Sequence, residues 1–367
     1  MKKNGTGTTK WLRGILALAG AALFVAVYPL LSPTLGWLLE QAAIFTTVLD
    51  MPTGAVETLR ERYADSVLPS DYTESEEPPA PQTETPGESE SPSELPAEEI
   101  PEEYRGTVSE VQFTGEETPV YSRWNNAWIR NYTDLTDAEI QKVLKTSASV
   151  RIKESTLPQV LIYHTHATES FEPYDSTVFD IRHTWRDSDN RSNMVAVGDV
   201  LAQGLFDSGV AVCHDDTQHD NPSYTGAYDR SAVTIAGYLK QYSSIRVLLD
   251  VHRDAIVYSD TAIAKTTATI NGKKAAQLMI IAPCDDGSVG VPDWKENFRF
   301  AVELTNRIEE AYPGLTRPVF FCYRTYNFAL SDGALLLEFG TNGNTLEEAQ
   351  YTAQLIAPIL AQYLSGK

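Results

Sequence analysis

The chain has 367 residues, and its 29 Lys and Arg against 50 Asp and Glu give a formal net charge of −21. This charge argues against nucleic acid as the main partner, because phosphate binding depends on clustered basic side chains. With 42% hydrophobic and 22% charged residues the composition is that of a globular protein, and the length allows about two domains. Three cysteines, none of them in a C-x-x-C motif, exclude a disulfide framework.

The N-terminal part predicts a membrane anchor. Residues 14–31 carry no charge and are just long enough to cross a bilayer as a helix. Basic residues precede this stretch and none follows until Arg60, so the positive-inside rule predicts residues 1–13 as a cytoplasmic tail. We therefore expect a single-pass protein of the cell membrane whose C-terminal domain lies outside the cytoplasm. A cleaved signal peptide is the alternative.

Two further segments separate this anchor from the rest of the chain. Residues 32–69 have apolar side chains at roughly helical spacing and predict a juxtamembrane helical region. Residues 70–104 are rich in Pro, Glu, Ser and Thr, with almost no large apolar residue. Such a composition cannot bury enough surface to offset chain entropy, so we expect a disordered, acidic linker.

Residues 105–367 predict the folded domain. Apolar, often β-branched runs alternate with helical patterns, which indicates an α/β fold with a mostly parallel, twisted sheet and helices on both faces. The predicted strands are 159–163, 209–213, 245–251, 278–282, 318–322 and 334–339. The predicted helices are 193–206, 229–242, 294–311 and 345–364.

Polar residues follow three of these strands. His164, His166 and Glu169 come after the first, His252 follows the third, and Glu338 lies in the last. The carboxyl ends of parallel strands meet at one edge of a sheet, where ligand sites gather. Two imidazoles and a carboxylate are the ligand set of a catalytic zinc, which keeps one position open for water. A further carboxylate, Glu338, could then accept the proton of that water.

His164 and His166 cannot both point toward such a site, because side chains alternate along an extended segment. We favour His166, which stands at the loop and shares a His-x-x-Glu motif with Glu169. The polar run 214–220 also follows a strand and is either a solvated loop or a contributor to the metal site or a substrate groove. The mild charge of the folded domain leaves room for a basic groove near Arg253.

Several blocks of this domain resemble the stage II sporulation protein P family of endospore-forming bacteria. The resemblance covers about residues 120–365. The blocks are, in chain order, 158–171, 193–201, 219–231, 249–255, 294–297, 312–315 and 333–345.

The family is related to zinc-dependent N-acetylmuramoyl-L-alanine amidases. The resemblance implies cleavage of the amide between the lactyl group of the glycan and the first L-alanine of the stem peptide. It also implies endopeptidase activity on peptide cross-links. The implied setting is engulfment during sporulation, with peptidoglycan as substrate and other membrane proteins as partners, one of them a lytic transglycosylase.

By position, His166 and His252 resemble the two zinc histidines of the amidases, and Glu338 resembles their catalytic glutamate. The amidase glutamate ligand lies at the start of the following helix, near residues 190–193, where this chain has none. Glu169 is therefore our chemical substitute for that ligand. A non-catalytic envelope scaffold that binds peptidoglycan or a partner protein is the alternative function.

Overall fold

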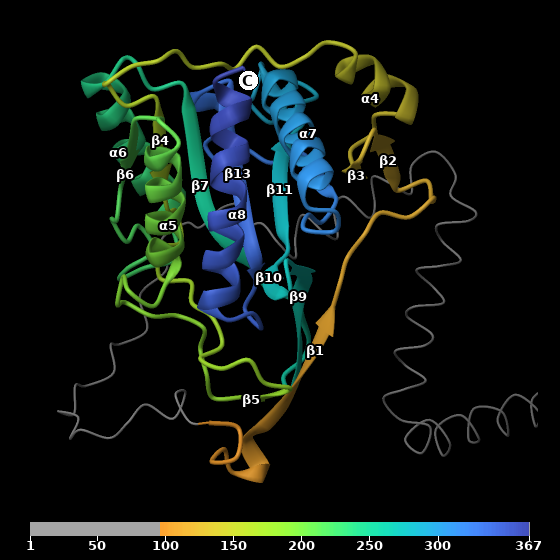
Figure 1. The fold of residues 1–367 in the computed structure, drawn as a ribbon, viewed down its shortest axis with the longest axis vertical. Helices are drawn as coiled ribbons and strands as arrows, with labels where there is room; N and C mark the ends of the chain where they lie inside the picture. Colours follow the sequence, from red (N-terminus) through yellow and green to blue (C-terminus); the bar gives the residue numbers. More distant parts are fainter. Residues whose placement is uncertain (1–95, 367) are drawn as a thin grey trace, which may run out of the picture. The chain divides into compact units, whose positions relative to one another are not determined.

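A computed structural model describes residues 96–366, and its larger sheet has eight strands (Figure 1). The mostly parallel α/β sheet expected from the sequence is confirmed, because among the described strands of this sheet only the pairs β2–β3 and β11–β13 are antiparallel. In spatial order the strands are β2 (Tyr121–Trp124), β3 (Ala127–Tyr132), β12 (Val319–Cys322), β11 (Leu278–Pro283), β13 (Gly333–Thr341), β7 (Val247–Asp254), β4 (Val160–Tyr163) and β6 (Val212–His214).

Three helices lie side by side over one face of this sheet: α5 (Met194–Asp207), α8 (Leu346–Leu364) and α7 (Trp294–Ala311) (Figure 1). Their apolar faces and the strands beneath them form the main core, because the central strands are buried along nearly their whole length. Two further helices, α4 (Asp137–Leu144) and α6 (Ala227–Gln241), lie outside this layer (Figure 1). Helix α8 begins at a capping box, in which Thr345 and Glu348 satisfy each other's backbone N–H groups.

A second sheet of five strands was not expected from the sequence. It contains β10 (Lys273–Ala276), β9 (Ala262–Ile270), β1 (Arg105–Val111) and β5 (Val178–Asp180), and β8 (Val257–Ser259) pairs with β9. The hairpin between β9 and β10 turns at Asn271 and Gly272, both of which have positive φ, as a tight two-residue hairpin requires. Two short 3₁₀ helices, η2 (Glu102–Tyr104) and η3 (Phe328–Leu330), complete the regular elements of residues 96–366.

The predicted membrane location needs correction. Across residues 96–366 no helix combines the length and apolar character needed to cross a membrane, which contradicts the prediction of a single-pass membrane protein. The predicted tail 1–13, anchor 14–31 and helical region 32–69 lie outside the described residues, as does most of the predicted linker 70–104. The end of that linker is ordered, because Ile100 is buried and its carbonyl accepts a hydrogen bond from Arg105 Nε at 2.8 Å.

Candidate metal centre

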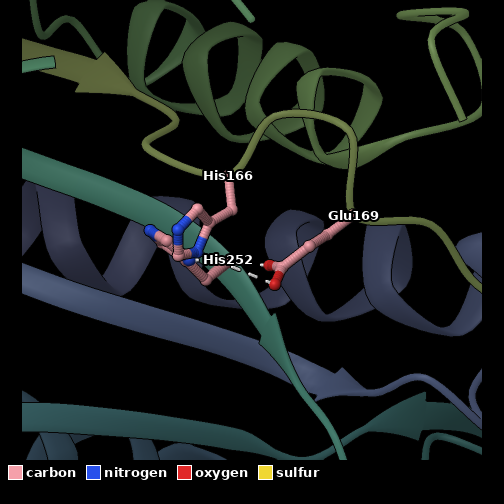
Figure 2. Close-up of side chains that lie close together, drawn as sticks. All are labelled: His166, Glu169 and His252. Atoms are coloured by element: carbon pink, nitrogen blue, oxygen red, sulfur yellow. Dashed lines mark ion pairs between the residues drawn. The ribbon is translucent and has the colours of Figure 1, made fainter. Parts of the chain in front are cut away.

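The structure brings His166, Glu169 and His252 together near one end of strands β4 and β7 (Figure 2). His166 and Glu169 lie on the loop that follows β4, and His252 lies within β7, which pairs in parallel with β4. Glu169 reaches both histidines: its Oε2 lies 3.5 Å from His252 Nδ1, and its Oε1 lies 3.9 Å from His166 Nδ1. One ligand atom of each residue falls within 4.8 Å of the other two.

These three side chains fit a zinc ion. Two ligands of a tetrahedral zinc with bonds of 2.0–2.1 Å stand about 3.3 Å apart, which is near the separations measured around Glu169. All three residues are buried, so the carboxylate and imidazoles are held away from bulk water. Two nitrogens and one oxygen also leave the fourth tetrahedral position open for water or substrate.

The pKa values of the three residues describe the protonation of the cluster without a metal. Burial lowers the pKa of His166 to about 4, and the positive charge of His252 adds to this, so His166 is neutral with a free lone pair. Burial would raise the pKa of Glu169, but the charge of Arg253 and the contact with His252 outweigh it and hold that pKa well below its usual range. Burial likewise opposes the charge on His252, yet Asp250 and Glu169 raise its pKa well above the usual value. A metal at this place would therefore displace a proton from His252.

His164 is not part of this cluster. It is fully buried, with its Nδ1 2.9 Å from the Val251 carbonyl and its Nε2 2.8 Å from Nε2 of His214. Burial, followed by the charge of His214, lowers the pKa of His164 to about 3. The pair packs against Gly198 of α5, where an added Cβ would lie 2.6 Å from His164 Nε2. Of the two candidates left open by the sequence, only His166 lies in the cluster, and its role as a ligand stays a prediction.

The polar run 214–220 supports the site from outside. His214 pairs with His164, and His219 contacts the His164 carbonyl at 2.8 Å and Thr234 Oγ1 at 2.9 Å. Asp220 is buried and accepts hydrogen bonds from Thr168 and Arg186. Neither histidine of this run lies in the His166–Glu169–His252 cluster, while His219 and Asp220 bond to the loop that carries His166 and Glu169.

Glu338 lies beside His252 on the neighbouring strand. The two residues are register partners in the parallel pair β13–β7, so their side chains leave the same face of the sheet about 4.8 Å apart. Oε2 of Glu338 is buried and has no hydrogen-bond partner among the described residues. Burial, reinforced by the negative charge of Asp254 and opposed by His252, raises the pKa of Glu338 to about 8. A carboxyl with this pKa can both accept and release a proton near neutral pH.

Arg253 itself does not line the basic groove for which the sequence left room. Arg253 is buried, and its guanidinium donates to the carbonyls of Ser170 and Trp185, each at 2.8 Å. Its NH1 also lies 3.9 Å from Glu169 Oε1. Arg253 thus fastens the site loop to β7, and it does not line an open surface.

A pocket of about 410 Å³ adjoins the cluster. Arg186 reaches it from one side and lies 3.6 Å from Glu169 Oε1, while the ring of Tyr224 is stacked on His166 with ring centroids 4.3 Å apart. Tyr228 meets the same histidine edge-on and is stacked on Tyr326. The pocket is lined by Thr168, Arg186, Asp187, Ser188, Asp220, Asn221 and Tyr224.

The sequence analysis missed these aromatic residues, Arg186 and Asp250. The tyrosines and Arg186 lie in loops and in α6, where no local pattern connects them with the site. Asp250 did have a signal, because it precedes His252 by two residues and so shares its face of the strand.

The comparisons with known proteins now bear on this site. A model of the family described as Stage II sporulation protein P (SpoIIP) matches residues 61–361. The chain belongs to this family. A curated relative of the same name from Bacillus subtilis (strain 168) is 32% identical over 217 residues, which are 55% of this chain and 50% of the relative. The chain thus spans about half the length of the curated family member it matches.

Two solved amidases are also similar. The N-acetylmuramyl-L-alanine amidase Ami1 from Mycobacterium smegmatis is 11% identical with a TM-score of 0.33, covering 58% of this chain and 100% of that chain. The CwlD amidase from Clostridioides difficile, solved in complex with the GerS lipoprotein, is 11% identical with a TM-score of 0.34, covering 57% of this chain and all of that chain.

Proposed function

We propose that this chain is a zinc-dependent peptidoglycan hydrolase that cleaves the N-acetylmuramoyl-L-alanine amide during sporulation. The observation that carries the proposal is the buried His166–Glu169–His252 cluster with Glu338 beside it, whose Oε2 has no hydrogen-bond partner among the described residues. Membership of the stage II sporulation protein P family supports the setting and the substrate. Cleavage of peptide cross-links, and partners such as a lytic transglycosylase, remain predictions of that membership.

The chain's own residues supply binding and proton transfer. His166, Glu169 and His252 would hold the zinc, which would supply an acidified water and a Lewis acid for the scissile carbonyl. Glu338 accepts the proton of the attacking water and passes it to the leaving amine of L-alanine, so that one carboxyl serves as base and then as acid. Arg253 and Arg186 hold Glu169 in its ionised form, with NH1 and NH2 atoms 3.9 and 3.6 Å from Oε1.

A digest of purified peptidoglycan tests this function. The zinc-loaded chain is expected to release stem peptides that begin with L-alanine, identified by mass. Glu338→Gln should keep the zinc and lower the rate by about 10²–10⁴-fold, the usual contribution of general acid–base catalysis. Glu310→Gln, the same change at an exposed position of α7, is the matched control and should digest as the wild type does.

Three outcomes would contradict the proposal. If the wild type bound no zinc, the proposed metal site would be refuted. If the wild type and Glu338→Gln gave equal digests, the proposed role of Glu338 as base would be refuted. A wild type that binds peptidoglycan without releasing any product would instead favour the scaffold function.

A further inference from the structure

Asp250 stands directly behind the proposed ligand His252. It lies two residues earlier in β7, is completely buried, and places its Oδ1 2.7 Å from Nε2 of His252. This distance is that of a close ion pair, although the alignment is not that of a hydrogen bond. A fully buried carboxylate is costly unless it is paired, so its position against the histidine calls for an explanation.

Hydrogen bonds from another loop fix this carboxylate in place. The backbone N–H of Thr165 donates to Oδ1 at 2.9 Å, and the Thr165 hydroxyl donates to Oδ2 at 2.7 Å. Because that hydroxyl proton is used, the Thr165 oxygen is an acceptor toward Ser231 Oγ, 2.9 Å away on α6, whose single proton is shared with the Tyr228 carbonyl at 3.1 Å. Asn327 in turn donates to Ser231 Oγ, also at 2.9 Å. Thr165 thus holds the carboxylate of Asp250 directly, while Ser231 on α6 contacts Thr165 and Asn327 in the loop after β12 contacts Ser231.

The two nitrogens of His252 therefore face different partners. Nε2 faces Asp250, whereas Nδ1 faces Glu169 and the rest of the cluster. A histidine binds a metal through a nitrogen that carries no proton, and the group that faces the other nitrogen decides which one that is. The carboxylate of Asp250, 2.7 Å from Nε2, attracts the remaining proton to that nitrogen and leaves Nδ1 for the metal.

We propose that Asp250 is a positioning residue that selects Nδ1 of His252 as the metal ligand, with Thr165, Ser231 and Asn327 holding the carboxylate in place. This inference rests on the proposed zinc function. It assigns a role to the residue two positions before the second histidine, and it links the proposed metal site to α6 and to the loop after β12.

Zinc affinity tests the proposal directly. The dissociation constant of the full chain is measured by competition with a chromophoric chelator, for wild type and for Asp250→Asn. Loss of such a supporting carboxylate is expected to weaken zinc binding by about 10–100-fold. Asp199→Asn is the matched control, because Asp199 contacts Nδ1 of His214, 3.0 Å away, in the other histidine–carboxylate pair, and its affinity should not change.

A second measurement needs no variant that could fail to fold. The chain has six histidines, so a spectrum of ¹⁵N-histidine-labelled, zinc-loaded wild type can resolve each ring. His252 should show a protonated Nε2 and a zinc-bound Nδ1. Zinc on Nε2, or an Asp250→Asn affinity within about threefold of wild type, would overturn the inference while leaving zinc binding intact. A wild type that binds no zinc would instead overturn the proposed function, and this inference with it.

Discussion

Two histidines separated by one residue have opposite environments in this protein. His164 is enclosed with His214, whereas His166 meets Glu169, His252 and the ring of Tyr224. The alternation of side chains along an extended segment was enough to predict that only one of them joins the site. Which one joined could be inferred from the His-x-x-Glu spacing, whereas the pairing of His164 with His214 depends on contacts across fifty residues that no local pattern contains.

His166→Ala is accordingly expected to lose zinc, because it removes one of the three donor atoms of the cluster. His164→Asn should keep one zinc per chain and only lower the free energy of unfolding, by about 1–3 kcal/mol, since His214 then loses its buried partner. Zinc content by elemental analysis and urea unfolding separate the two effects. Loss of zinc from folded His164→Asn, or its retention in His166→Ala, would contradict this assignment.

Glu172 gives the fold a dependence on pH. It is buried, accepts a hydrogen bond from Trp185 Nε1 at 2.5 Å, and has its pKa raised to about 7, chiefly by burial. Below pH 4.5 the carboxyl is protonated in both the folded and the unfolded chain. As pH rises from 4.5 to 7 the unfolded chain loses its proton first, so stability falls across this window and stays lower above it.

Glu172→Gln should remove that loss, because the amide oxygen can still accept from Trp185 and carries no charge. The variant is expected to be more stable than wild type at pH 8, by up to about 3 kcal/mol, and equally stable at pH 4. Urea unfolding at both pH values measures the difference. Glu347→Gln at an exposed position of α8 is the control and should change stability by less than about 0.5 kcal/mol at either pH.

At the scale of elements, helix α5 depends on a glycine where it crosses the buried histidine pair. A Cβ at Gly198 would lie 2.5 Å from His214 Nε2 and 2.6 Å from His164 Nε2, both held by their mutual contact. The close approach of α5 to strands β4 and β6 therefore requires a residue without a side chain.

Gly198→Ala should consequently destabilise the protein by about 1–2 kcal/mol, because crowding outweighs the better helix propensity of alanine. Gly237→Ala is the matched control, since Gly237 lies inside α6 with no atom within 4 Å of an added Cβ. It should stabilise by about 0.5–1 kcal/mol. The urea midpoint of unfolding is expected to fall for Gly198→Ala and to rise for Gly237→Ala. Equal shifts in the two variants would refute the packing argument.

The sequence predicted every helix of the layer over the large sheet and six of its eight strands, all but β2 and β3, because most of these segments are apolar and periodic. It did not predict the second sheet, and β9 shows why. Lys265, Thr266 and Thr267 are buried in that strand, where an apolar run would normally mark a strand. Their partners, among them Glu348, Asn344 and Glu110, lie far away in the sequence, so the burial of these polar residues becomes visible only in the fold.

For the whole molecule, zinc should act as a folding ligand. The ligand atoms come from a loop and a strand that meet only in the folded chain, so the unfolded chain offers no matching site. Free zinc at a hundred times its dissociation constant is then expected to stabilise the fold by about 2.7 kcal/mol. Thermal unfolding with zinc and with a chelator measures this, and His166→Ala should unfold at the same temperature in both. If the chelator left the unfolding temperature of the wild type unchanged, zinc binding would not be linked to folding.

The exposed turn at Asn271 and Gly272 falls between the parts of the site along the chain. A cut there would leave His166, Glu169 and His252 on one fragment and Glu338 on the other, while β7 and β13 remain neighbours only if the fragments reassociate. The first fragment would carry every proposed metal ligand and no base, and the second the base alone. Peptidoglycan cleavage would therefore require the two fragments to reassociate. It could be used to detect that reassociation, as in a split enzyme.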